Sequence, residues 1–82
     1  MNKVIFITAP WCATCKQLKP LAQDICNRNK VEMQILDMVV DESECSKYLP
    51  TSLPFIVYGN EAIAGGACNR VSIEAMIIRG NE

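Results

Sequence analysis

A short apolar strand that leads directly into an amphipathic helix is the feature that most constrains this fold. The run KVIFIT at residues 3–8 is continuous, apolar and rich in β-branched side chains, which is typical of a strand buried on both faces. From Trp11 to about Asn29 the apolar residues recur at helical spacing instead. Because such a strand needs cover on both faces, the pattern predicts an α/β fold with helices on both faces of its sheet.

Two weaker patterns follow this strand and helix. Residues 31–38 predict a half-exposed strand, because apolar and polar side chains alternate at the start of the segment. The alternating residues are Val31, Met33 and Ile35 against Glu32 and Gln34. The tetrapeptide DESE resembles a capping box, with Asp41 as N-cap and Glu44 at N3, and predicts a short helix to about Leu49.

The last third of the chain predicts a hairpin and a final helix. Two apolar segments surround the dipeptide Gly59-Asn60, a good two-residue hairpin turn. A helix that stops near Gly80 follows. Its apolar face consists of Ile73, Met76 and Ile77. The whole order is β-α-β-α-β-β-α, in which the first β-α-β unit implies a parallel pair and the hairpin adds antiparallel strands. Residues 1–82 are therefore expected to form one domain around a four-stranded mixed sheet.

The size and charge of the chain exclude several classes of function. Its 82 residues leave room for one modest core. A net charge of −1 provides no broad basic face for nucleic acid and no polybasic membrane anchor, and no apolar run approaches a span of about 18 residues. Five cysteines, an odd number, favour a reducing compartment. Without a signal-peptide pattern at its start, the chain is expected to be cytoplasmic, and we also expect a monomer.

Cys12 and Cys15 stand where the buried strand ends and the helix begins. The first amides of a helix lack intrahelical partners and carry about half a positive charge, so they stabilise a thiolate on Cys12 and lower its pKa. Lys16 and Lys19 also favour the anion. Cys15, one turn further on, is expected to be buried and about 5–6 Å away, close enough for a disulfide. These positions predict Cys12 as the nucleophile and Cys15 as the resolving cysteine.

Two other interpretations of the cysteine pair have less support. The two residues could be inert core positions, but a strand–turn–helix context favours a redox pair. A zinc site wants four ligands, and histidine is absent. Cys26 is also expected roughly 16 Å along the helix from Cys15, too far to share an ion. We expect no metal site, with Cys26 and Cys45 in the core and Cys68 in a glycine-rich loop where it could be exposed.

The segment WCATCKQLKP resembles the active-site segment of the thioredoxin superfamily. It has the tryptophan, the two cysteines, a lysine directly after them and a proline five positions past the second cysteine. SLPFIVY at residues 52–58 resembles the second signature of the superfamily, in which a cis-proline opens a strand. The motifs occur in the right order, and the resemblance covers nearly the whole chain. It implies a minimal thioredoxin fold and a small dithiol–disulfide oxidoreductase.

The resemblance also implies roles for residues around the cysteines. Pro54 is expected to be cis and packed against the cysteine pair, where it keeps metal from binding. Leu53 is expected to offer its backbone to an extended segment of the substrate protein. Trp11 is expected to flank the site as a platform, with a plain surface or core aromatic as the alternative. The other members of this shallow docking surface are expected to be Ala13, Thr14 and Lys16.

The glutaredoxin branch of the superfamily is the alternative. Gly65-Gly66 resembles the glycine pair that holds glutathione in glutaredoxins, although a turn into the last helix explains it equally well. Asn69 stands in place of the nearby acidic residue, and Ala9 replaces the upstream lysine. The second hypothesis is therefore a glutathione-dependent protein, or one that holds an iron–sulfur cluster through Cys12 and glutathione at a dimer interface. A redox-inactive interaction module is the third.

Two departures from thioredoxins bear on the chemistry. Ala13-Thr14 replaces Gly-Pro between the cysteines, which affects the redox potential, and Phe6 stands where thioredoxins keep a buried acid, so a slower second step is expected. No organic cofactor is needed, because the two sulfurs store the electrons. The expected partners are disulfide-containing client proteins, with ribonucleotide reductase a candidate from the family alone. The expected electron donor is a thioredoxin reductase or glutathione.

Overall fold

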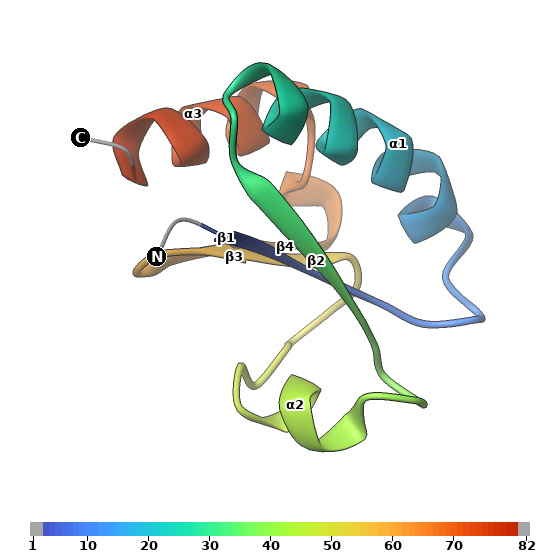
Figure 1. The fold of residues 1–82 in the computed structure, drawn as a ribbon. Helices are drawn as coiled ribbons and strands as arrows, with labels where there is room; N and C mark the ends of the chain where they lie inside the picture. Colours follow the sequence, from blue (N-terminus) through green and yellow to red (C-terminus); the bar gives the residue numbers. More distant parts are fainter. Residues whose placement is uncertain (1–2, 81–82) are drawn as a thin grey trace.

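The computed structural model describes residues 3–80, which alternate between strands and helices (Figure 1). The elements are β1 (Lys3–Thr8), α1 (Ala13–Arg28), β2 (Glu32–Asp37), α2 (Glu42–Ser46), β3 (Phe55–Tyr58), β4 (Glu61–Ala64), the short 3₁₀ helix η1 (Gly65–Ala67) and α3 (Arg70–Gly80). Apart from the 3₁₀ turn, this is the predicted β-α-β-α-β-β-α order. The helix expected from Trp11 begins two residues later.

The strands form one mixed sheet in the order β2-β1-β3-β4. β1 pairs in parallel with β2 and antiparallel with β3, and β3 pairs antiparallel with β4. β1 is therefore an inner strand, and its residues 4–7 are buried. A strand that is covered on both faces needs an uninterrupted apolar run, which is why the sequence here does not alternate.

Helices cover both faces of the sheet, as predicted (Figure 1). α1 and α3 pack together on one face, and α2 lies on the other. The larger hydrophobic cluster contains Val4 and Phe6 of β1 together with residues of α1 and α3. The smaller cluster contains Ile5 and Ile7 of β1 together with Cys45 of α2. Successive residues of β1 thus supply opposite clusters, as the pleat of a strand requires.

The hairpin and the final helix form as the sequence predicts. Gly59 has a φ of +62° in the turn between β3 and β4, a conformation that glycine adopts without steric cost. The three apolar residues predicted to face the core from α3 are all fully buried. These residues are Ile73, Met76 and Ile77.

The alternation predicted for residues 31–38 holds at Val31, which is buried, and at Met33, which packs against the larger cluster, but it is wrong at Ile35. Ile35, expected on the inward side, is 39 % exposed, whereas Leu36 is buried in the smaller cluster. β2 is an edge strand, so Ile35 has a neighbouring strand on one side only. On the opposite face of the sheet α2 packs against β2. Leu36 is buried there, in the smaller cluster with Cys45 of α2. At this end of β2, Leu36 is buried because a helix covers it. The alternation at the start of the segment does not predict this.

The capping box predicted for α2 does not form, and the helix is shorter than expected. Asp41 is the N-cap, but its side chain makes no hydrogen bond to a helix amide. Its Oδ2 instead accepts from the N–H of Asp37 at 2.9 Å, and its own N–H donates to the carbonyl of Asp37 at 2.7 Å. Asp41 therefore closes the loop between β2 and α2. The helix ends at Ser46, before Leu49, which has a φ of +49°.

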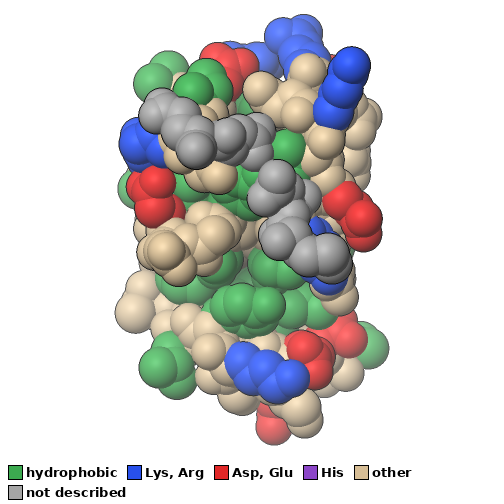
Figure 2. Space-filling view, turned by 60° about the vertical axis from the view of Figure 1, so that its left-hand side comes forward, with side chains coloured by type: hydrophobic (Ala, Val, Ile, Leu, Met, Phe, Trp, Pro, Cys, Tyr) green, Lys and Arg blue, Asp and Glu red, His purple; other side chains and the backbone are tan. Residues whose placement is uncertain are grey.

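Charged side chains of both signs are interspersed over the face shown in Figure 2. Exposed ion pairs join Asp24 to Arg28 and Glu44 to Lys47, and pairs of this kind contribute at most about 1 kcal/mol each. Within residues 3–80, no helix has the length and apolar character that crossing a membrane requires.

Candidate active site

The turn between β1 and α1 holds Cys12 at the N-terminus of the helix. The N–H of Cys12 donates to the carbonyl of Ala9 at 3.1 Å. Cys12 is the N-cap residue, with an extended backbone (φ −95°, ψ 96°), and its Sγ accepts from the N–H of Cys15 at 3.2 Å. One of the first amides of α1 therefore points at the Cys12 sulfur, which is the arrangement that a thiolate at a helix N-terminus needs.

Cys12 and Cys15 are joined by a disulfide bond, with their Cα atoms 5.3 Å apart. Cys12 is partly exposed, whereas Cys15 is fully buried in the larger cluster. Thiol–disulfide exchange depends on access to the sulfur that is attacked or attacks. The difference in exposure therefore supports the predicted division into a nucleophilic Cys12 and a resolving Cys15.

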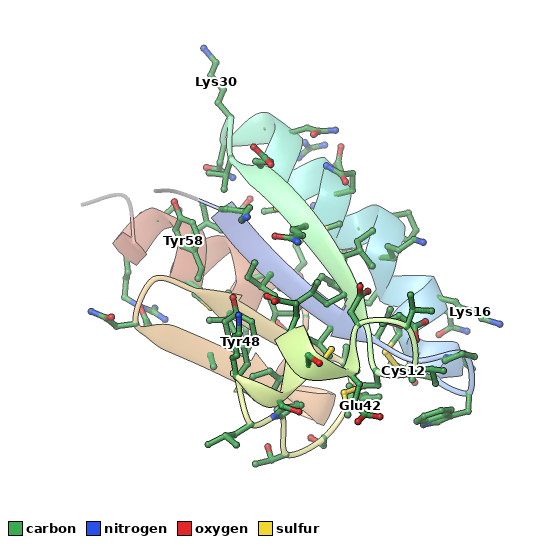
Figure 3. All side chains as sticks on the ribbon, turned by 60° about the horizontal axis from the view of Figure 1, so that its bottom comes forward. Cys12, Lys16, Lys30, Glu42, Tyr48 and Tyr58 are labelled. Carbon is green, nitrogen blue, oxygen red and sulfur yellow. A yellow bond between two sulfur atoms is a disulfide. The ribbon has the colours of Figure 1, made fainter. Side chains whose placement is uncertain are left out.

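The side chains beside the cysteine pair are open to solvent. Trp11 is 69 % exposed, so the alternative of a core aromatic is wrong. Ala13, Thr14 and Lys16 are exposed as well. Figure 3 shows Cys12 and Lys16 at the same end of α1, far from Lys30 at the other end. The site is a shallow surface, without a pocket among residues 3–80.

The Leu53–Pro54 peptide bond is cis, as the resemblance implies. The residue after Pro54, Phe55, pairs with Ile7 of β1. Because of this pairing, Pro54, which is buried, lies at the end of the sheet where β1 stops and the turn to Cys12 begins. Leu53 is partly buried and packs against both clusters, and Cys12 also packs against the larger one.

The glycine pair, Gly65-Gly66, lies at this same end of the sheet. Ala64 pairs with Phe55, so Gly65 comes opposite Pro54, and its N–H donates to the Pro54 carbonyl at 2.8 Å. Gly65 has a φ of +57°, and the neighbouring Gly66 is exposed. The structure thus brings the glycine pair to the segment before β3, residues 50–54, which we call the proline loop. A glutathione-binding role for the pair stays a prediction.

We predict that Gly65→Ala lowers the free energy of unfolding more than Gly59→Ala does. Both residues have positive φ, at which a Cβ costs about 1–2 kcal/mol. A Cβ on Gly65 would also lie 2.9 Å from Ser52 Oγ, whereas one on Gly59 or Gly66 meets nothing within 4 Å. Urea unfolding measures the differences, with Gly66→Ala as a nearly neutral control. Equal losses for Gly65→Ala and Gly59→Ala would contradict the crowding at Gly65.

The other cysteines are free thiols. Burial raises the pKa of Cys26 and of Cys68 to about 11. The pKa of Cys45 is raised by burial first and then by nearby carboxylates, led by Asp41. Such thiols keep their protons at neutral pH and are poor nucleophiles. Cys26 and Cys45 lie in the core as predicted, but Cys68 is half-buried rather than an open loop residue. Across residues 3–80, no three His, Cys, Asp or Glu side chains gather into a candidate metal site.

Phe6 makes the interior beneath the site apolar. It is fully buried and belongs to the same cluster as Cys15. The part of the chain that the structure describes has no buried charged side chain. No carboxylate is therefore buried beside Cys15 among the described residues to accept its proton.

The loop after β2 adds an apolar surface that the sequence did not indicate. The N–H of Met38 donates to the carbonyl of Thr8 at 2.9 Å, so this loop lies beside the end of β1 that leads to Cys12. Val39 and Val40 in the loop are 57 % and 80 % exposed. In the sequence the two valines only extend the apolar character of the preceding strand, and no motif marks them as surface residues.

Comparisons with known proteins agree with this geometry. The family model described as Thioredoxin matches residues 2–78, and no curated protein sequence matches significantly. Thioredoxin 1 of Thermosipho africanus is 17 % identical with a TM-score of 0.84, over 94 % of this chain and 91 % of that chain. Fasciola hepatica thioredoxin is 22 % identical with a TM-score of 0.85, over 96 % and 80 % of the two chains. The reduced thioredoxin pre-protein of Schistosoma mansoni is 20 % identical with a TM-score of 0.86, over 95 % and 77 %.

These structural likenesses show the fold, and the family model covers nearly the whole chain. The bonded Cys12–Cys15 pair at the helix N-terminus adds the chemistry of a thiol–disulfide oxidoreductase. The chain, with its mixed four-stranded sheet and its cysteine pair at the end of β1, belongs to the thioredoxin family.

Proposed function

We propose that this protein reduces disulfide bonds in other proteins. The observation that carries the proposal is the difference in exposure between the two bonded cysteines, with the accessible sulfur at the N-terminus of α1. In such a pair the exposed Cys12 can react with a large substrate protein from one side. The buried Cys15 then releases the substrate and ends the reaction.

The first step is attack by Cys12. In the reduced protein, the N–H of Cys15 and the positive end of α1 stabilise the Cys12 thiolate, since that amide already points at the sulfur. The thiolate attacks one sulfur of the client disulfide and forms a mixed disulfide. The other client sulfur leaves as a thiolate and takes a proton from water.

The second step is resolution by Cys15. Its thiol loses a proton and attacks Cys12 Sγ, so the Cys12–Cys15 bond forms, the mixed disulfide breaks and the second client thiolate leaves. The client gains two electrons and two protons in total. With Phe6 beneath the site and no buried acid among residues 3–80, the proton passes to water or to the departing client thiolate. We expect this step to be slow compared with that of a relative that has a buried acid.

Docking uses the exposed surface around Cys12. We assign the client segment to a position over Trp11, Ala13 and Thr14, with its backbone beside that of Leu53. The exposure of Trp11 and the position of the Leu53–Pro54 bond at the end of β1 support this assignment. Lys16 lies at the same end of α1 as Cys12 (Figure 3) and adds a positive charge that favours the thiolate.

The electron donor that we favour is a thioredoxin reductase, because the family model that matches is that of thioredoxins. Glutathione is the alternative, supported only by the position of the glycine pair. Ribonucleotide reductase is a candidate client from the family alone. We also propose that the protein works in the cytoplasm as a monomer. The support for the cytoplasm is the odd number of cysteines, which favours a reducing compartment.

The test is a coupled assay of insulin reduction. Purified protein is supplied with NADPH and a thioredoxin reductase, or with glutathione and glutathione reductase, and NADPH consumption is followed. We expect turnover with the thioredoxin reductase and none in a Cys12→Ser control. Turnover with glutathione alone would move the protein to the glutaredoxin-like alternative. No reduction with either donor or with dithiothreitol would refute the proposed function.

A further inference from the structure

We propose that Cys68 is a positioning residue that holds the proline loop for client docking. Its thiol donates a hydrogen bond to the Pro54 carbonyl, at an Sγ–O distance of 3.4 Å. The residue before Pro54 is Leu53, whose backbone is assigned above to the client segment. This inference rests on the proposed function, and it adds a residue that no sequence motif indicated.

The Pro54 carbonyl is a backbone anchor of this loop. Proline has no N–H, so its carbonyl is its only backbone hydrogen-bonding group. Within the described chain, residues 50–53 make no backbone hydrogen bond, and the bonds resume at Pro54. The backbone hydrogen bond that fixes the end of the proline loop is therefore the one to the carbonyl of Pro54.

Both donors to this carbonyl come from the turn after β4. The N–H of Gly65 donates to it at 2.8 Å, and the Cys68 thiol is the second donor. The N–H of Cys68 also donates to the carbonyl of Gly65 at 3.0 Å. One hydrogen-bonded turn, from Gly65 to Cys68, thus supplies both donors to the Pro54 carbonyl. Loss of the thiol would leave the loop with one donor.

The environment of Cys68 suits a hydrogen-bond donor rather than a nucleophile. The side chain is half-buried and packs against the larger cluster. Burial raises the pKa of its thiol to about 11, so the proton that it donates stays in place at neutral pH. An apolar side chain could fill the same space but could not donate to Pro54.

The experiment separates donation from packing by comparing Cys68→Ala with Cys68→Ser. We expect Cys68→Ala to raise the KM for insulin about threefold, as the loss of a weak neutral hydrogen bond gives, with kcat unchanged. Cys68→Ser keeps a donor and should restore the wild-type KM. Reduction of the small disulfide DTNB, which needs no loop pairing, should be unchanged in both variants. Cys26→Ala, which removes a thiol from the same cluster, should leave the KM for insulin unchanged.

A second readout follows the hydrogen bond itself. Hydrogen exchange of the Gly65 amide, measured by NMR, should be faster in Cys68→Ala than in wild type and normal in Cys68→Ser. Unchanged KM and unchanged exchange in Cys68→Ala would overturn the inference, and so would equal defects in Cys68→Ala and Cys68→Ser. An inactive wild-type protein would overturn the proposed function. The exchange measurement tests the Cys68 hydrogen bond whether or not the protein is active, so the two failures are distinguishable.

Discussion

Replacement of Cys12 by serine is expected to abolish thiol–disulfide exchange, whereas replacement of Cys15 by serine should stop the reaction at its midpoint. Cys12 is the partly exposed sulfur, and the N–H of Cys15 points at it. A serine hydroxyl stays protonated at neutral pH and does not attack disulfides. Insulin reduction by Cys12→Ser should therefore fall to the rate measured without protein.

The Cys15→Ser variant keeps the attacking thiolate but lacks the buried sulfur that releases the client. We expect it to accumulate a covalent mixed disulfide with the client through Cys12. Mass spectrometry under non-reducing conditions measures the adduct, and dithiothreitol should remove it. Cys26→Ser, which changes a buried thiol outside the pair, is the control and should form no stable adduct. Turnover by Cys12→Ser, or an adduct through another cysteine, would contradict the assigned roles.

Alkylation of the reduced protein should be strongly selective for Cys12. Burial raises the pKa of Cys68 to about 11, so only about one thiol in 10⁴ is a thiolate at pH 7. The helix N-terminus stabilises the Cys12 thiolate instead. Because less basic thiolates are also weaker nucleophiles, the rates should differ by less than the thiolate fractions. We expect iodoacetamide to modify Cys12 at least about 100 times faster than Cys68.

The pH dependence gives the same prediction a second test. The rate at Cys68 should rise about tenfold per pH unit until the pH approaches its pKa of about 11, whereas the rate at Cys12 should level off at lower pH. Peptide mass spectrometry after timed labelling measures each site. The oxidised protein is the control, since its disulfide protects Cys12 and Cys15. Equal labelling of Cys12 and Cys68 at pH 7 would contradict the assignment of Cys12 as the activated thiol.

The sequence predicted the fold well wherever burial or turn chemistry left a strong local pattern. The apolar run of β1, the hairpin turn at Gly59 and the apolar face of α3 all form as expected. Cys15 is buried because it lies on the face of α1 that also carries Leu18 and Ala22. The cis bond before Pro54 came from the family resemblance, because an X–Pro bond alone favours trans.

The sequence could not predict contacts that depend on where one element meets another. Ile35 is exposed because β2 is an edge strand, a position that its own residues do not reveal. Asp41 matched a capping box, yet its carboxylate is drawn to the amide of Asp37 across the loop. Cys68 looked like a loop residue, and only the pairing of β3 with β4 brings it to Pro54.

The most direct test of a reversible Cys12–Cys15 redox pair is a titration of Trp11 fluorescence in graded thiol–disulfide buffers. Trp11 is the only tryptophan in the chain and adjoins Cys12. We predict one reversible two-electron transition, with a midpoint near about −270 mV for a thioredoxin-like reductant. A midpoint near about −200 mV would favour the glutaredoxin-like alternative. The absence of any transition, with both thiols still free to alkylate across the whole series, would contradict the central claim.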